Sequence, residues 1–423
     1  MSLMRLGLLL ASTLSLLGQS PVGNFEGELQ TPSTKLRIGL TITAAKDGTY
    51  ASELISFSQG NAKMAASTTT IEGKSVKLAI AAAGASYEGT FSEDSQTITG
   101  KFTQGLPFDL VFKRVAEFAK PNRPQEPKPP FSYLSEDVSF AGATAEILMA
   151  GTITTPKSEG KFPAVILVSG SGPQNRDEEL VGHKPFLVWA DALTKSGFAV
   201  LRYDDRGTYK STGTFKGATS QDFALDTAAA VAYLKTRKDI DPKRIVVMGH
   251  SEGGIIAPIV ASKDPSLAGI VLLAGPGVSG ERIIEKQIPD MGRAAGLSEQ
   301  QVKLSTEGGL QRVKQEMAKD AWLANFWTYD PAPTLEKVLC PVLAINGELD
   351  KQVDATVNLG AIEAALKKGG NKTYTVRVLP KLNHLLQTAT TGSSQEYGQI
   401  EETVAPIALE EVIQWLKKLP ATK

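Results

Sequence analysis

A serine between two glycines is the clearest candidate for chemistry in this chain. Gly249-His250-Ser251-Glu252-Gly253 follows a β-branched apolar run and leads directly into an apolar helical pattern. This order predicts a strand, a sharp turn and a helix, and glycine avoids the collision that a Cβ would cause in so tight a turn. The N–H groups that begin the helix would stabilise negative charge beside the serine hydroxyl. Because G-x-S-x-G alone also occurs in ordinary loops, the flanking strand and helix carry the prediction that Ser251 is a nucleophile.

A serine hydroxyl is a weak nucleophile at neutral pH, so it needs a neighbouring base and a third group that orients the base. The chain has three histidines. His250 adjoins Ser251 in the turn, where consecutive side chains diverge, and His183 lies in a loop or helix start far upstream. His384 follows the last predicted strand, at the sheet edge expected to carry Ser251. Elimination therefore favours His384 as the base, and a purely structural histidine is the alternative.

The orienting acid should lie between Ser251 and His384, after a strand. The segment 341–354, PVLAINGELDKQVD, is a buried-strand pattern followed by a turn that contains Glu348, Asp350 and Asp354. Asp350 has the spacing from which a loop side chain would reach across the sheet edge to His384. We therefore favour Asp350, and a solvated acidic turn is the alternative interpretation for the other two.

These three residues predict acyl transfer. His384 would deprotonate Ser251 as it attacks an ester carbonyl, Asp350 would orient the imidazole, and water would hydrolyse the acyl-enzyme. The scheme requires no metal and no organic cofactor.

The order Ser251, Asp350, His384 resembles that of the α/β-hydrolase fold over about residues 133–420. The segment 168–177, VSGSGPQNRD, is similar to the oxyanion loop of this family, with Ser169 where histidine is usual. The resemblance implies an oxyanion hole made by the backbone N–H groups of Ser171 and Glu252.

Two further features extend the resemblance. The segment 201–213, LRYDDRGTYKSTG, resembles the family's D-x-R-G-x-G-x-S turn, with Tyr209 in place of the second glycine. The combination with an N-terminal β-domain is similar to secreted bacterial carboxylesterases, distantly related to serine aminopeptidases. It implies a small-molecule ester substrate with a short to medium acyl chain. A peptidase or amidase with the same triad remains an alternative, as does a catalytically silent binding protein on this fold.

The pattern after residue 132 alternates apolar strands with longer helical segments, which predicts an α/β domain over 133–423 with a mostly parallel eight-stranded sheet. The strands are expected at 133–140, 145–154, 163–169, 198–203, 244–248, 269–274, 341–346 and 373–379. The helices are expected at 184–196, 219–237, 252–262, 355–368 and 402–418. The insertion 280–335 has helical patterns and no strand pattern, so we expect a helical cap.

Two patterns around the cap have competing interpretations. Residues 275–280 match G-x-G-x-x-G, but a dinucleotide site also needs an acidic residue after a second strand, and helical sequence follows instead. We interpret this segment as the flexible stem of the cap. The cap also contains aromatic residues that would form either its core or a wall of the substrate pocket, namely Trp322, Phe326, Trp327 and Tyr329.

The N-terminal part of the chain has a different organisation. Residues 21–118 alternate short β-rich runs with turn signals, which predicts an all-β accessory domain, a small sandwich or closed barrel with bends at glycine. Residues 119–132 are expected to be a linker, since five prolines within 121–130 favour extended polyproline II. Residues 1–20 resemble a secretory signal peptide, with Arg5 before an apolar stretch too short to span a membrane comfortably. Secretion or periplasmic localisation follows from it, and an uncleaved membrane anchor is the alternative.

The composition excludes several other classes. Basic and acidic side chains balance at 45 each. The sequence therefore has no excess of positive charge that would favour binding to nucleic acid or stable association with an anionic membrane. The single cysteine, Cys340, excludes an intramolecular disulfide, and one cysteine with three histidines leaves too few ligands for a structural zinc site.

Overall fold

The computed structural model describes residues 20–31, 35–57, 62–294 and 297–420. The apolar stretch of the expected signal peptide lies outside these residues. The chain divides into two compact units, Met1–Lys120 and Pro121–Lys423, each of which is described by itself. Within the described residues no helix combines the length and the hydrophobicity needed to cross a bilayer.

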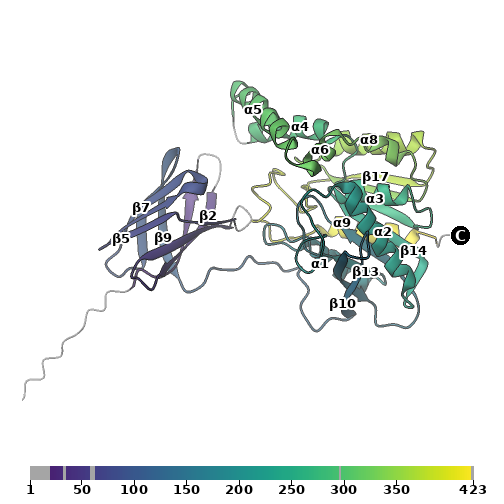
Figure 1. The fold of residues 1–423 in the computed structure, drawn as a ribbon, viewed down its shortest axis with the longest axis horizontal. Coiled ribbons are helices and arrows are strands. Elements are labelled where there is room, and N and C mark those ends of the chain that lie inside the picture. Colours follow the sequence, from purple (N-terminus) through teal and green to yellow (C-terminus); the bar gives the residue numbers. More distant parts are fainter. Residues whose placement is uncertain (1–19, 32–34, 58–61, 295–296, 421–423) are drawn as a thin grey trace, which may run out of the picture. The chain divides into compact units, whose positions relative to one another are not determined.

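The N-terminal unit is a single antiparallel sheet with the order β4-β3-β2-β1-β9-β8-β7-β6-β5 (Figure 1). Its strands are β1 (Gly23–Gln30), β2 (Lys35–Ala44), β3 (Tyr50–Ser56), β4 (Ala62–Ala65), β5 (Thr68–Glu72), β6 (Ser75–Ile80), β7 (Ala85–Phe91), β8 (Thr97–Gln104) and β9 (Leu106–Val115). A hydrogen bond of 2.7 Å between Ser52 Oγ on β3, next to one end of the sheet, and Thr69 Oγ1 on β5, at the other end, shows that the sheet curls on itself. The all-β prediction for this region is confirmed.

Two of the glycines at which bends were predicted, Gly89 and Gly100, make room for a buried ring. Gly89 on β7 pairs with Gly100 on β8, and the ring of Tyr87 packs against both. The Tyr87 hydroxyl donates to the Leu110 carbonyl at 3.1 Å. A Cβ at either glycine would press on this ring, so both positions permit the curvature that encloses the core.

The C-terminal unit contains an eight-stranded mixed sheet with the order β10-β11-β13-β12-β14-β15-β16-β17. Its strands are β10 (Leu134–Ala141), β11 (Leu148–Thr155), β12 (Phe162–Val168), β13 (Ala199–Tyr203), β14 (Ile240–His250), β15 (Gly269–Leu273), β16 (Val342–Gly347) and β17 (Tyr374–Leu379). Neighbours are parallel from β13 to β17, whereas the β10/β11 and β11/β13 pairs are antiparallel.

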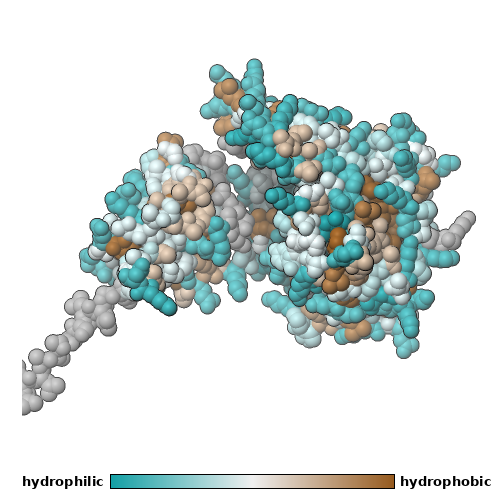
Figure 2. All heavy atoms as spheres, viewed as in Figure 1, coloured by the Kyte–Doolittle hydropathy of each residue, from teal (hydrophilic) through white to brown (hydrophobic). Residues whose placement is uncertain are grey.

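Helices cover both faces of this sheet and bury its apolar strands (Figure 1). One face is covered by α1 (Pro185–Lys195) and α9 (Pro406–Lys418). The other is covered by α2 (Ser220–Thr236), α3 (Gly253–Ala261), α7 (Ala332–Leu335) and α8 (Ala355–Lys368). The exposed surface of the unit is mostly hydrophilic in Figure 2, with small apolar patches between the polar side chains.

The predicted strands and helices of this unit are present, and three of them begin three or four residues from the predicted start. β11 begins at Leu148, after the expected 145. β14 begins at Ile240, before the expected 244. The last helix begins at Pro406 and not at 402. The backbone N–H groups of Thr403 and Val404 both donate to Gln125 Oε1, which holds these residues outside the helix, and proline is favoured at the first helical position.

The insertion between β15 and β16 is helical, as expected. It contains α4 (Gly280–Ala294), α5 (Glu299–Met317) and α6 (Ala321–Thr328), which Figure 1 shows as a layer above the sheet. Ser298 and Gln301 form the capping box of α5. The 275–280 segment was expected to be a flexible stem but is packed tightly, because a Cβ at Gly277 would overlap the Asn358 carbonyl and one at Gly280 would overlap the Phe326 carbonyl. These glycines allow the cap stem to lie close to α8 and α6.

The start of the proline-rich segment packs against other loops of the C-terminal unit, to which it belongs. The Arg123 guanidinium donates to the carbonyls of Gly182, Gly398 and Ile400. Gln125 accepts the two N–H groups before α9. These contacts hold the start of the segment against the loops that precede α1 and α9.

The tightest junction of the unit is the turn between β14 and α3. Ser251 has a φ of 52°, in the left-handed region, between His250 at the end of the strand and Gly253 at the start of the helix. A Cβ at Gly249 would overlap the Gly253 carbonyl, and a Cβ at Gly253 would overlap the Val168 carbonyl on β12. Only glycine at both positions allows the strand, the turn and the neighbouring strand to approach so closely.

Gly249→Ala is expected to lower the free energy of unfolding by about 3 kcal/mol, because the added methyl group meets backbone that cannot move without displacing β14 or α3. Urea unfolding followed by tryptophan fluorescence measures this unit alone, since all four tryptophans lie within 121–423. Gly360→Ala is the control, because Gly360 lies in α8 with open space around its Cα. The control should be unchanged or more stable by up to about 1 kcal/mol. Equal stability of the two variants would contradict the proposed crowding.

Candidate active site

The turn after β14 places Ser251 beside His384. His384 Nε2 lies 3.1 Å from Ser251 Oγ, and His384 Nδ1 lies 2.7 Å from Asp350 Oδ2. His384 and Asp350 are buried, each about 4% exposed. The structure therefore brings together the three residues that the sequence analysis selected. Because an ionised carboxylate only accepts hydrogen bonds, it fixes the proton of His384 on Nδ1 and leaves Nε2 free to accept from the serine.

Asp350 has its other oxygen occupied by the backbone. Asp350 Oδ1 accepts from the N–H groups of Gln352 and Val353 at 2.8 and 2.9 Å. These bonds orient the carboxylate so that only Oδ2 faces the imidazole. The tight turn after β16 therefore aims Asp350 at His384.

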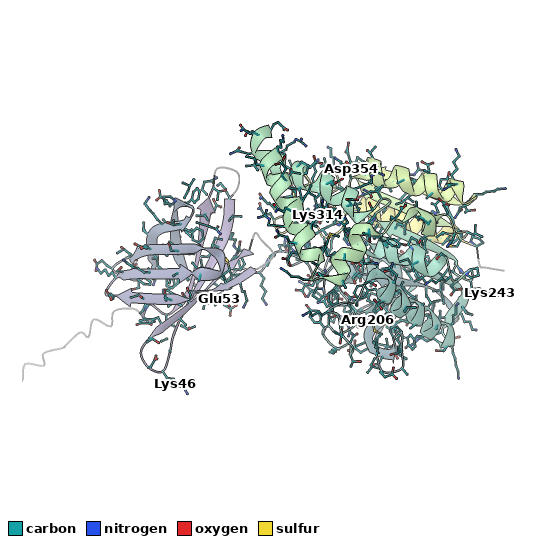
Figure 3. The ribbon with its side chains drawn as sticks, turned by 45° about the horizontal axis from the view of Figure 1, so that its top comes forward. Lys46, Glu53, Arg206, Lys243, Lys314 and Asp354 are labelled. Atoms are coloured by element: carbon teal, nitrogen blue, oxygen red, sulfur yellow. The ribbon has the colours of Figure 1, made fainter. Side chains whose placement is uncertain are left out.

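The other two acidic candidates have different partners. Glu348 Oε2 accepts from the Lys381 backbone N–H at 3.0 Å. Asp354, labelled in Figure 3, caps α8 by accepting from the Val357 N–H at 2.9 Å. Neither carboxylate contacts His384.

His183 lies apart from Ser251 in a buried polar cluster. Its Nδ1 is 2.9 Å from Thr403 Oγ1 and its Nε2 is 2.9 Å from the Tyr397 carbonyl. Burial, assisted by the positive charge of Arg123, lowers the pKa of His183 to about 4. This neutral histidine packs the loops before α1 and α9.

The loop after β12 approaches Ser251 from the other side. A Cβ at Gly170 would lie 3.1 Å from Ser251 Cβ, which places the next residue, Ser171, beside the nucleophile candidate. The Gly170 N–H donates to Glu178 Oε1 at 2.7 Å. The backbone N–H groups of Ser171 and Glu252 donate no hydrogen bond to any other residue in the part of the chain that the structure describes. Both donors are thus available to a ligand at Ser251.

Three carboxylates hold this loop, residues 169–174; Glu178 and Glu252 are buried and Asp205 is partly buried. Asp205 accepts from Ser169 Oγ at 2.9 Å and from the Gln174 N–H at 3.0 Å. Glu178 holds Gly170, and Glu252 interacts with the Ser171 hydroxyl. Burial raises the pKa of Asp205 to about 8 and raises that of Glu252. Neither Asp205 nor Glu178 was predicted from the sequence, although Ser169 stands where histidine is usual in the family that this sequence resembles.

His250 also has a role that the sequence analysis missed. Its ring diverges from Ser251, as expected, but Nδ1 lies 2.9 Å from Glu178 Oε1 and Nε2 lies 3.0 Å from the His384 carbonyl. No local pattern in the sequence links Glu178 to His250, since the contact forms only when β12 and β14 lie side by side.

The turn after β13 accommodates Tyr209 where the related sequences have glycine. Tyr209 has a φ of 46°, in the left-handed region that glycine normally occupies, and its side chain is 72% exposed. Arg206, labelled in Figure 3, donates to Asp226 Oδ2 at 2.6 Å and so fixes the turn against α2. The substitution therefore leaves the backbone of the turn in the conformation that glycine would adopt.

A cleft of about 610 Å³ opens beside Ser171. Its apolar lining comes from the loop after β12, from the segment before α2 and from α6, and includes Pro173, Phe215, Ala321 and Trp322. Trp322 Nε1 donates to Glu252 Oε1 at 2.8 Å, which connects the cap to the turn at Ser251. Trp327 is buried, and Phe326 stacks on Trp322 at 5.3 Å. Both interpretations of the cap aromatics thus apply, to different rings.

The described side chains contain no group of three or more His, Cys, Asp or Glu residues arranged to hold a metal ion. Cys340 is partly buried and packs against the core of the sheet.

Comparison with known proteins identifies the family. Residues 146–360 match the family of X-Pro dipeptidyl-peptidase (S15 family). The esterase EstD of Thermotoga maritima is 30% identical over 306 residues, which cover 68% of this chain and 69% of that protein. The uncharacterized protein YfhR of Escherichia coli O157:H7 is 32% identical over 166 residues, or 38% of this chain and 55% of the relative.

A solved structure of the Pyrococcus furiosus esterase Pf2001 has a similar fold, with 20% identity and a TM-score of 0.45 over 68% of this chain and 93% of that one. The family match lies within the unit that contains the three residues; it includes Ser251 and Asp350 and ends before His384. The chain therefore belongs to the serine hydrolases of the α/β-hydrolase fold, in the family described as X-Pro dipeptidyl-peptidase (S15 family).

Proposed function

We propose that this protein hydrolyses carboxylic esters with Ser251, His384 and Asp350 as its catalytic triad. The observation that carries the proposal is the continuous hydrogen-bonded chain from Ser251 Oγ through the His384 ring to Asp350, at 3.1 and 2.7 Å. In this arrangement a base contacts the nucleophile and an acid orients the base.

The proposed reaction has two halves. Ser251 Oγ attacks the ester carbonyl while His384 Nε2 takes its proton, and the Ser171 and Glu252 N–H groups stabilise the oxyanion. Collapse of this intermediate breaks the ester bond, and His384 returns the proton to the leaving alcohol. Water then attacks the acyl-enzyme with His384 again as base, which releases the acid and restores Ser251. Every proton passes through His384, so the scheme uses neither a metal nor an organic cofactor.

The cleft beside Ser171 supports a small-molecule ester as the substrate. Its volume of about 610 Å³ lies within the range typical of small-ligand pockets, and aromatic side chains line it. A short to medium acyl chain would bury its apolar surface against Phe215 and Trp322. We therefore assign this cleft to the acyl group.

A peptidase or amidase is the second candidate, since the family description names a dipeptidyl-peptidase whereas the relative from Thermotoga maritima is named an esterase. The same acyl-enzyme forms from an ester or an amide, and only the leaving group differs. The two candidates are separated by kcat/KM for an ester and an amide that carry the same acyl group. A higher value for the amide would replace the esterase proposal.

We further propose that residues 1–20 direct export and that residues 21–118 form an accessory domain joined by 119–132 to the catalytic domain 133–423. The apolar sequence after Arg5 supports the export proposal. The N-terminal sequence of the mature protein recovered from the producing cells tests it, because export with cleavage removes this segment.

Ser251→Ala is expected to lower kcat by about a millionfold, because the covalent step is lost. The measurement pairs ester hydrolysis with fluorophosphonate labelling, mapped by mass spectrometry. The wild type should be labelled stoichiometrically at Ser251, and both Ser251→Ala and His384→Ala should remain unlabelled there. A folded wild type that is not labelled would favour a binding protein on this fold.

Asp350→Asn is expected to lower kcat by about ten thousandfold, since the amide no longer fixes the His384 tautomer or stabilises its cation. Asp354→Asn is the matched control, because asparagine caps a helix as well as aspartate and Asp354 does not contact His384. The control should retain kcat within about threefold. If the two variants lost activity equally, Asp350 would not be the orienting acid.

Trp322→Ala is expected to enlarge the acyl cleft and to raise kcat/KM for an octanoyl ester relative to a butanoyl ester by about tenfold. Trp327→Phe, a change of a buried cap ring outside the cleft, should leave this ratio unchanged. Steady-state kinetics with the two esters measures the ratio. An unchanged ratio in the Trp322 variant would place the acyl chain elsewhere.

A further inference from the structure

The side chain of His250 is almost fully enclosed although it adjoins Ser251 in the chain. Both of its ring nitrogens face oxygen atoms, Glu178 Oε1 at 2.9 Å and the backbone carbonyl of His384 at 3.0 Å. A carbonyl and an ionised carboxylate both accept hydrogen bonds and cannot donate them. Two such partners require a proton on each ring nitrogen, so the geometry describes an imidazolium.

The competing arrangement puts the proton on Glu178 Oε1 and leaves His250 neutral. That oxygen, however, also accepts the Gly170 N–H at 2.7 Å. An ionised carboxylate oxygen is a strong acceptor and can accept hydrogen bonds from both Gly170 and His250. A protonated oxygen would donate its hydrogen to His250 and would accept the Gly170 N–H more weakly. The position of Gly170 therefore favours an ionised Glu178 beside a charged His250.

The groups around His250 also favour a cation. It faces Glu178 on the loop after β12, and Asp350 on the loop after β16 acts on it at longer range. The neighbouring ring of His384 has its centroid 5.0 Å away and is itself paired with Asp350. Burial is the largest single effect and acts to lower the pKa of His250. Glu178, the hydrogen bond to the His384 carbonyl and the charge of Asp350 together outweigh it, so the pKa lies above its usual value.

We propose that His250 is a buried imidazolium paired with Glu178, and that this ion pair positions the oxyanion loop and the His384 loop around Ser251. Glu178 Oε1 holds the Gly170 N–H, one residue before the proposed oxyanion donor Ser171. His250 Nε2 holds the backbone of the proposed base. The catalytic role in this inference rests on the proposed function. The charge state of His250, however, is measured independently of activity.

The pair is also sensitive to pH, in a definite direction. Because the pKa of His250 is raised in the folded protein, the pair contributes its full stability below the usual histidine value of about 6.5. The contribution is lost as the pH rises through the raised pKa. Loss of the proton would leave Glu178 as an unpaired buried carboxylate.

The first test is the protonation state of the three histidines in the intact protein. Proton–nitrogen NMR of the full chain labelled at histidine should show two ring N–H protons and imidazolium nitrogen shifts for His250 at pH 7. His183 is the internal reference, because burial lowers its pKa to about 4 and its ring should be neutral. Signals lost in His250→Asn and His384→Ala assign the spectrum. A neutral His250 ring in the wild type would overturn the ion pair.

Glu178→Gln tests the positioning role. Glutamine keeps the size of the side chain and an oxygen for the Gly170 N–H, but it removes the charge, so the His250 ring should become neutral at pH 7. We expect kcat to fall roughly tenfold to a hundredfold with KM within about threefold, since the reacting groups are displaced while the substrate cleft is unchanged. Glu179→Gln, at the adjacent exposed position, is the matched control and should retain wild-type kcat.

The outcomes separate this inference from the proposed function. If Ser251 is labelled by fluorophosphonate and Glu178→Gln keeps wild-type kcat, the positioning role is overturned and the esterase proposal stands. If the wild type is not labelled but His250 is an imidazolium that Glu178→Gln neutralises, the ion pair stands and the esterase proposal fails.

Discussion

Close backbone contact at the end of β14 is the constraint on which the rest of the site depends. The strand ends at His250, the helix begins at Gly253, and the left-handed Ser251 lies between them. The missing Cβ atoms of Gly249 and Gly253 let this turn press against the end of β12. This backbone packing brings the loop that follows β12 close to Ser251, with Gly170 in contact with the serine.

The same packing surrounds a group of carboxylates, which most protein interiors exclude. Glu178 and Glu252 are each at most 3% exposed, Asp205 is partly buried, and all three lie around one short loop. Burial of a carboxylate is unfavourable unless hydrogen bonds or an opposite charge compensate for it. Here the compensation comes from the loop itself, through the Ser169 hydroxyl and the Gly170 N–H, and from His250. The carboxylates therefore fix the loop by the bonds that keep them in the interior.

The sequence predicted the parts of this arrangement that follow from chain order and periodicity. Parallel strands deliver their following loops to one edge, so a serine after β14, an acid after β16 and a histidine after β17 were expected to meet, and they do. The pairing of His250 with Glu178 could not be predicted from the sequence, because it depends on which strands are neighbours and on the direction in which each side chain points. The start of the last helix was missed for a similar reason, since Gln125, far away in the chain, holds Thr403 and Val404 outside it.

Glu252 connects substrate binding to the proposed chemistry. Its backbone N–H is one of the two proposed oxyanion donors, whereas its carboxylate accepts from Ser220 on α2 and from Trp322 on the cap. A shift of the cap that moved Trp322 would therefore also move the proposed donor. Under the proposed function, an acyl group bound against Trp322 would fix that ring and, with it, the position of the donor. The fit of the substrate in the cleft and the stabilisation of the transition state would then depend on one side chain, so binding energy from the acyl group would contribute to the chemical step.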